Sequence, residues 1–116
     1  MSELVARAER GDERADLAVQ LFSYAVKKQL GAYAAALGGL DCLVFTGGIG
    51  EHAPRVRELA SSGLEALGLV LDASRNRANA SVISAANSRA EIRVIGTDEE
   101  RVIARHAFAL ASAAPT

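Results

Sequence analysis

The chain has 116 residues, half of them apolar, and a formal net charge of −1. This is enough for one domain, or for one piece of a larger domain, with a real core. The charges are interspersed, which excludes the basic field typical of nucleic-acid binding. A single cysteine excludes an internal disulfide framework. Because no targeting segment or membrane-length apolar run is visible, the sequence predicts a soluble, cytoplasmic protein with no membrane contact.

A long amphipathic helix is predicted over residues 12–37. Apolar residues recur there at helical spacing and form a wide stripe, and charged residues lie outside it. The pair Gly38 and Gly39 ends the pattern, as glycine often does after the last turn of a helix. The stripe indicates that this helix packs on a sheet or on other helices.

A short strand, a glycine-rich turn and a second helix follow. Residues 40–45 are continuously apolar, which is typical of a strand buried on both faces, and Cys42 is interpreted as a small buried hydrophobe rather than a catalytic thiol. The turn occupies residues 46–52. The second helix is predicted over residues 53–67, with Pro54 in its first turn and Gly68 at its end.

The remainder of the chain alternates short apolar runs with polar segments. Strands are predicted at residues 69–71 and 91–95, a short strand at residues 81–84, and a polar loop at residues 72–79. A last helix is predicted from residue 98 to about residue 110, with a tail at residues 111–116 that is expected to fray. The element order predicts an α/β or α+β layered unit. Its few short strands and long apolar helix indicate that part of its surface packs against further protein.

The glycine turn is the first segment that predicts chemistry. A strand that runs into glycines and then into a helix presents bare backbone N–H groups to a phosphate, although paired glycines alone can simply permit a tight turn. A dinucleotide fingerprint is one reading, with Gly48, Gly50 and Ala53 in the turn and Asp72 holding a ribose hydroxyl. Glu51 argues against it, because a carboxylate inside the loop would face the pyrophosphate.

The acidic segment at residues 97–100 is the second such region. Thr97 and Glu100 form a capping box, and acids at a helix N-terminus are favoured by the helix dipole, so a purely structural role explains them. The same carboxylates are also hard oxygen ligands suited to Mg²⁺ beside a nucleotide phosphate. Arg55 and Arg57 open the second helix either as solvated charges or as partners of an anionic ligand.

Taken together, these segments resemble the acetate kinase family, within the acetate and sugar kinase/Hsp70/actin superfamily. The resemblance runs through the helix at residues 15–33, the glycine segment at residues 44–51, residues 67–72 with Asn76, and the acidic segment at residues 97–100 followed by Ile103 and Ala104. Glycine loop, spacer and acidic segment occur in the family's order. Nearly the whole chain is covered, and it matches the C-terminal portion of the family's enzymes.

The resemblance implies an α/β fold, namely a partial actin-like ATPase (ribonuclease H-like) lobe with a short mixed sheet packed with helices. It implies ATP or ADP and Mg²⁺ as ligands, and the reversible reaction of ATP with acetate to give ADP and acetyl phosphate. Glu99 would lie near the Mg²⁺. His52 stands where the family often has asparagine, so the resemblance does not carry over a contact by that side chain. The residues that would line the nucleotide site are Gly48, Ile49, Gly50, Glu51 and His52.

The resemblance also implies that residues 1–116 are the C-terminal nucleotide-binding lobe, without the family's first lobe and most of its catalytic residues. No catalytic residue is therefore assigned, and the chain alone is expected to be inactive. Its expected partners are an adenine nucleotide and either a second copy of itself or the missing N-terminal lobe, because the family is dimeric through this lobe. A non-catalytic nucleotide-binding or interaction module and the dinucleotide-binding unit remain as alternatives.

Overall fold

The predicted long helix is the dominant element of the fold and is confirmed almost to the residue. The computed structural model describes residues 2–96, and in it α2 spans Glu13–Leu37. The Asp12 side chain accepts a hydrogen bond from the Ala15 N–H at 3.1 Å and so caps the helix start. Gly38 ends the helix with a φ of 79°, a left-handed conformation that favours glycine. The helix before it, α1 (Ser2–Glu9), is not among the elements predicted from the sequence.

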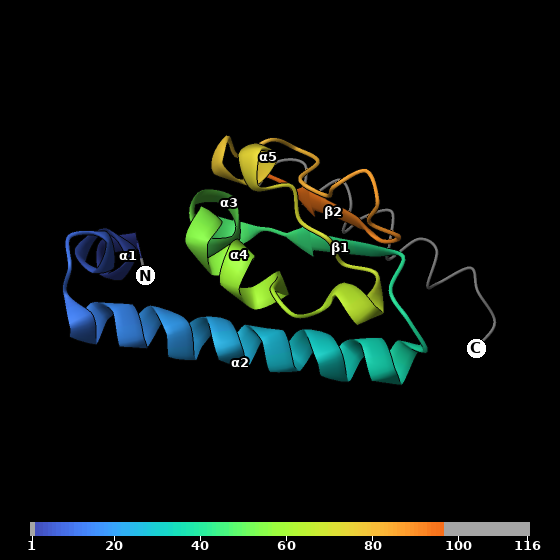
Figure 1. The fold of residues 1–116 in the computed structure, drawn as a ribbon, viewed down its shortest axis with the longest axis horizontal. Coiled ribbons are helices and arrows are strands. Elements are labelled where there is room, and N and C mark those ends of the chain that lie inside the picture. The colour runs from blue at the N-terminus through green and yellow to red at the C-terminus, as the bar shows by residue number, and fades with distance from the viewer. Residues whose placement is uncertain (1, 97–116) are drawn as a thin grey trace.

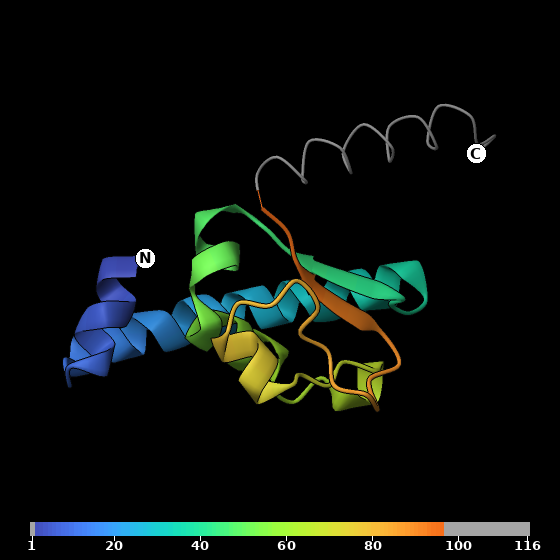
Figure 2. The ribbon, with the colours of Figure 1, turned by 90° about the horizontal axis from the view of Figure 1, so that it is seen from above.

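Two short parallel strands form the sheet above this helix. β1 (Cys42–Phe45) pairs in register with β2 (Glu91–Val94), so Phe45 lies opposite Val94. The inner face of the sheet packs toward the body of the protein, whereas the other face is open among the described residues (Figures 1 and 2). The prediction that the first strand is buried on both faces is therefore wrong. β1 alternates instead, with Leu43 and Phe45 buried.

Cys42 lies on the open face, and its predicted burial is also wrong. Its partial desolvation and the Glu91 carboxylate raise the pKa of the Cys42 thiol. A raised pKa disfavours the thiolate, the form in which cysteine reacts. The expectation that Cys42 is not a catalytic thiol is therefore consistent with its surroundings.

The segment between the strands differs most from the prediction. The helix expected over residues 53–67 is divided into α4 (Pro54–Ser61) and a 3₁₀ turn η1 (Glu65–Leu67), because Gly63 between them has a left-handed φ of 84°. The expected strand at residues 69–71 contributes one antiparallel bridge, from Leu71 to Ser84. The expected strand at residues 81–84 likewise contributes isolated bridges only. The expected loop at residues 72–79 contains α5 (Ala73–Arg77).

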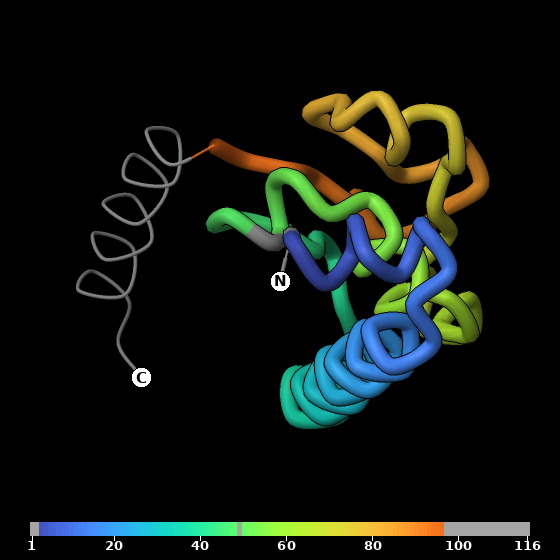
Figure 3. Tube along the Cα trace, turned by 90° about the vertical axis from the view of Figure 1, so that its left-hand side faces the viewer, coloured from blue at the N-terminus to red at the C-terminus, as the bar shows by residue number. Residues whose placement is uncertain are grey.

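Two clusters of buried side chains hold these elements together. The first joins the inner face of the sheet to the irregular segment after α4, through Leu69, Ile83 and Ile92 among others. The second joins α1, α2 and α4, through residues such as Val19 and Val56. In Figure 3, which looks along α2, the other described elements all lie on one side of that helix. No helix within residues 2–96 is both long and apolar enough to cross a membrane.

Candidate functional site

The carboxyl ends of the two parallel strands meet at one edge of the sheet, and this edge is the candidate site. The Ile95 N–H donates to the Phe45 carbonyl oxygen at 3.0 Å, and the Thr46 hydroxyl donates to the Ile95 carbonyl oxygen at 3.1 Å. The glycine segment that follows β1 therefore lies beside Gly96, the last residue that the structure describes. Ligands of open α/β sheets commonly bind at this edge.

The glycine segment is a short helix rather than the open turn that the sequence predicts. α3 spans Gly47–His52, directly after β1 (Figure 1), and Ala53 separates it from α4. Gly47 opens it with a φ of 76°, which only glycine adopts readily. The amides of its first turn have no acceptor within the helix, because each helix begins with unpaired N–H groups. The predicted order of strand, glycines and helix start is thus present, but the glycines lie inside the helix instead of in an open turn before it.

The glycines after Gly47 have different roles. A Cβ on Gly50 would lie 3.1 Å from the Phe45 carbonyl carbon, so glycine lets α3 fold back against the end of β1. A Cβ on Gly48 would meet no atom within 4 Å, and the φ of Gly48 is not in the left-handed range. Packing within the described chain therefore explains Gly50 but not Gly48. Gly31 in α2 has equally open surroundings, so Gly48 is a position where a substitution can be tested without disturbing the packing.

This difference predicts opposite effects on stability. Gly50→Ala is expected to lower the free energy of unfolding by about 1–2 kcal/mol, because the new methyl group presses on backbone atoms of β1. Gly48→Ala is expected to leave it unchanged or to raise it by up to about 1 kcal/mol, because alanine restricts the unfolded chain and favours the helix. Urea unfolding followed by circular dichroism measures both. Equal destabilisation by the two substitutions would contradict this assignment.

A buried arginine fixes the end of the glycine segment. Arg57 of α4 is fully buried, and its Nη1 donates to the Gly50 carbonyl oxygen at 2.7 Å. Its Nε donates to Asn76 Oδ1 at 2.7 Å, and its Nη2 donates to the Asn76 carbonyl oxygen at 2.8 Å and to Asn79 Oδ1 at 2.5 Å. Burial lowers the pKa of the guanidinium. Both sequence interpretations of Arg57, as a solvated charge and as a ligand partner, are therefore wrong.

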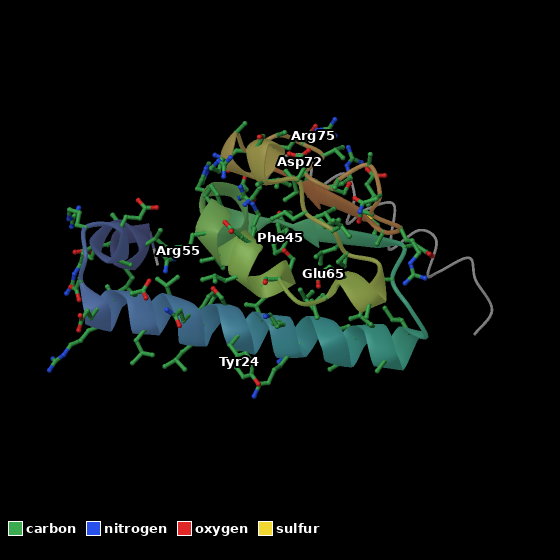
Figure 4. All side chains as sticks on the ribbon, in the orientation of Figure 1. Tyr24, Phe45, Arg55, Glu65, Asp72 and Arg75 are labelled. Carbon is green, nitrogen blue, oxygen red and sulfur yellow. The ribbon has the colours of Figure 1, made fainter. Side chains whose placement is uncertain are left out.

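The other arginine of α4 is also engaged by protein atoms. Arg55 forms an ion pair with Asp16 of α2 (Figure 4), and each side chain is about one-third exposed. It connects the start of α4 to the N-terminal half of the long helix. The two arginines that the sequence places near the glycine segment thus serve the fold in this structure.

Some of the remaining predicted site residues lie near the edge of the sheet, and others lie outside the described residues. Glu51 is half-buried, and its Oε1 lies 3.2 Å from the position of a Cβ on Gly96, so it sits where the two strands end. His52 is exposed and Ala53 is buried. The acidic segment with Glu99 lies outside the described residues. Within residues 2–96, no three His, Cys, Asp or Glu side chains gather in a group that could hold a metal ion.

The dinucleotide alternative required a parallel strand ending at Asp72. Residues 69–71 form no such strand, and Asp72 instead caps α5, where its Oδ1 accepts a hydrogen bond from the Arg75 N–H at 3.0 Å. The described chain therefore lacks the strand order on which that alternative depended.

Comparisons with known proteins show the family of the chain. Residues 1–105 match the sequence model of the Acetokinase family. The chain belongs to the acetokinase family. The acetate kinase of Dictyoglomus turgidum is 53% identical over 100 residues, which are 84% of this chain and 25% of that protein. The acetate kinase of a Sulfurovum species is 44% identical over 116 residues, which are 97% of this chain and 29% of that protein.

Solved structures of the family show the same fold. The crystal structure of Porphyromonas gingivalis acetate kinase aligns with a TM-score of 0.79 and 40% identity, covering 95% of this chain and 28% of that one. A propionate kinase from Francisella tularensis aligns with a TM-score of 0.76 and 40% identity, covering 85% of this chain and 26% of that one. The fold is therefore part of the actin-like ATPase fold, as predicted. The acetokinase-family chain spans about a quarter of the length of these relatives.

Proposed function

We propose that residues 1–116 form the C-terminal, adenine-nucleotide-binding part of an acetate kinase. The complete enzyme would transfer a phosphoryl group from ATP to acetate and release ADP and acetyl phosphate. The observation that carries the proposal is the match of residues 1–105 to the Acetokinase family, in a chain whose glycine segment α3 lies at the carboxyl edge of two parallel strands.

In this proposal, Gly48, Ile49, Gly50, Glu51 and His52 line the adenosine and phosphate side of an ATP or ADP site. The unpaired amides at the start of α3 provide donors to the nucleotide, and Arg57 keeps the end of that helix in place through the Gly50 carbonyl. Since residues 2–96 form no three-residue metal group, Mg²⁺ would be carried mainly by the nucleotide phosphates. Glu99 would lie near it.

Titration with Mg-ADP tests this site. The chain is expected to bind Mg-ADP, and Gly48→Ala is expected to weaken binding at least about tenfold, because the new methyl group occupies the approach to the backbone. Isothermal titration calorimetry measures the affinity, and the unfolding midpoint of the same variant must not fall. Binding of NADH in place of Mg-ADP, or equal affinity of Gly48→Ala and the unchanged chain, would contradict the proposal.

A non-catalytic nucleotide-binding or interaction module is the second candidate function. The observation that favours it is that both arginines near the glycine segment, Arg55 and Arg57, are engaged by protein atoms. In either case we propose a cytoplasmic chain whose partner is a second copy or an N-terminal lobe, and whose residues 111–116 form a tail. Nucleotide binding without turnover is expected of both candidates, so turnover restored by an added N-terminal lobe of an acetate kinase would favour the enzyme over the module.

A further inference from the structure

Arg57 carries a buried positive charge that no acid of the described chain neutralises. Its side chain is fully buried, and within residues 2–96 no carboxylate forms an ion pair with it. The four oxygens that accept its hydrogen bonds are carbonyl and amide oxygens of Gly50, Asn76 and Asn79, and all four are neutral. A buried charge without a counter-charge is costly, so the stability of the fold alone does not explain why Arg57 lacks one.

This charge lies directly behind the glycine segment. The Arg57 Nη1 donates to the carbonyl oxygen of Gly50 at 2.7 Å, and Gly50 lies within α3. At a rise of 1.5 Å per residue, the start of α3 is only about 5 Å further along the helix axis. A charge at this range acts strongly on an anion, because protein screens it less than water does. The guanidinium therefore adds positive potential at the edge of the sheet where the proposed nucleotide would bind.

The turn after α5 holds one of the neutral acceptors in place. Asn79 has a φ of 52° and is the only residue other than glycine with a positive φ within residues 2–96. The Ala80 N–H donates to the Arg75 carbonyl oxygen at 3.1 Å across this turn, a pattern that usually has glycine at the left-handed position. Glycine would serve the backbone at least as well. The hydrogen bond from the Arg57 Nη2 to Asn79 Oδ1, at 2.5 Å, gives the asparagine side chain a role that glycine could not fill.

We propose that Arg57 is a positioning residue whose uncompensated charge favours the phosphate groups of a ligand at the glycine segment. Arg57 does not touch the ligand. It fixes the Gly50 carbonyl, and its charge attracts the anion through the backbone of α3. Neutral acceptors are required for this role, because a carboxylate beside Arg57 would cancel the charge. The inference rests on the proposed nucleotide site and adds a source for its preference for anions.

Asn79→Asp separates the charge of Arg57 from its geometry. Aspartate also tolerates the left-handed conformation and accepts the same hydrogen bond, but it brings a negative charge next to the guanidinium. The variant is expected to unfold at a higher urea concentration than the unchanged chain, because the buried charge gains a partner. It is also expected to bind Mg-ADP about tenfold more weakly, because the positive potential at the glycine segment falls.

Urea unfolding followed by circular dichroism and isothermal titration calorimetry measure these two effects. The proposal requires them to have opposite signs, with a more stable chain and a weaker complex. A residue that only supports the fold would change stability and affinity in the same direction. Asn79→Asp that binds Mg-ADP as tightly as the unchanged chain, or that loses stability and affinity together, would overturn the proposal.

Two variants provide matched controls. Asn79→Gly keeps the left-handed turn and removes one acceptor without adding charge, so Mg-ADP affinity is expected to stay within about threefold of the unchanged chain. Asn87 lies in a different, exposed turn, and Asn87→Asp adds the same charge there. This variant is expected to change neither stability nor affinity, because exposed charges are screened. Weakening by either control equal to that of Asn79→Asp would overturn the proposal.

Inorganic pyrophosphate separates this inference from the proposed function. If the unchanged chain binds pyrophosphate but not Mg-ADP, and Asn79→Asp weakens pyrophosphate binding, the adenine-nucleotide assignment is refuted and the role of the charge is supported. Equal Mg-ADP binding by the unchanged chain and Asn79→Asp would refute only the role of the charge. Binding of neither ligand by the unchanged chain would refute both.

Discussion

Replacement of Arg57 with methionine is expected to lower the free energy of unfolding by about 3 kcal/mol or more, enough to unfold much of a marginally stable chain. Four hydrogen bonds connect this buried guanidinium to oxygens of Gly50, Asn76 and Asn79. Methionine fills similar space but donates none of them, so several buried acceptors lose their partner at once. Urea unfolding, followed by circular dichroism at the helix band, measures the change.

Arg55→Met is the matched control for this prediction. Arg55 belongs to the same helix and has the same charge, but its ion pair with Asp16 is partly exposed. Partly exposed pairs contribute about 1 kcal/mol or less, so the control is expected to remain folded. Arg57→Lys is expected to behave like Arg57→Met rather than like the control, because an ammonium group cannot reach the four acceptors in the geometry of a guanidinium. Similar unfolding curves for Arg57→Met and Arg55→Met would contradict the assigned role.

The parts of the fold that depend on neighbouring residues could be predicted from the sequence. The bounds of α2 follow from its apolar spacing, the Asp12 cap and the left-handed Gly38, all of which act within one turn. The two strands and the glycine segment were also located correctly. Their parallel pairing brings the glycine segment next to Gly96, so the edge of the sheet that forms the candidate site could be predicted once the two strands were known.

The parts that depend on distant residues could not be predicted. Arg57 is buried because Asn76 and Asn79, about twenty residues later, supply its acceptors, and nothing near Arg57 in the sequence indicates this. Its positions four residues after Ala53 and three residues before Ala60, both buried, are local signals of an inward-facing side chain. Leu69 misled the strand prediction for a similar reason. It is apolar because it fills the core, with 1% exposure, and not because it belongs to a ladder.

The glycine segment shows a limit of sequence patterns. The sequence presents Gly47, Gly48 and Gly50 as equivalent members of one phosphate-binding pattern. In the structure, Gly47 has a left-handed φ, Gly48 has open space around it, and Gly50 packs against Phe45. Only three-dimensional distances distinguish these cases, because each satisfies the same spacing. Gly48 is therefore a sharper target for nucleotide-binding experiments than the pattern as a whole.

The chain alone is expected to have acetate kinase turnover at least about a thousandfold below that of a full-length relative. Phosphoryl transfer is catalysed by positioning and by positive charge on the transferring group, and loss of one such arginine can cost about three to five powers of ten. Near the glycine segment, Arg57 is buried and makes four hydrogen bonds to neutral oxygens, and Arg55 is paired with Asp16. Neither is free to stabilise a transferring phosphoryl group.

The measurement is acetyl phosphate formation from Mg-ATP and acetate, trapped as the hydroxamate, with the acetate kinase of Dictyoglomus turgidum assayed in parallel. A rate within tenfold of that enzyme would contradict the prediction. Mg-ADP binding by the same sample separates two causes of a low rate. A chain that binds Mg-ADP without turnover has a formed nucleotide edge and lacks only the groups that act on the phosphoryl, as the engagement of Arg55 and Arg57 implies.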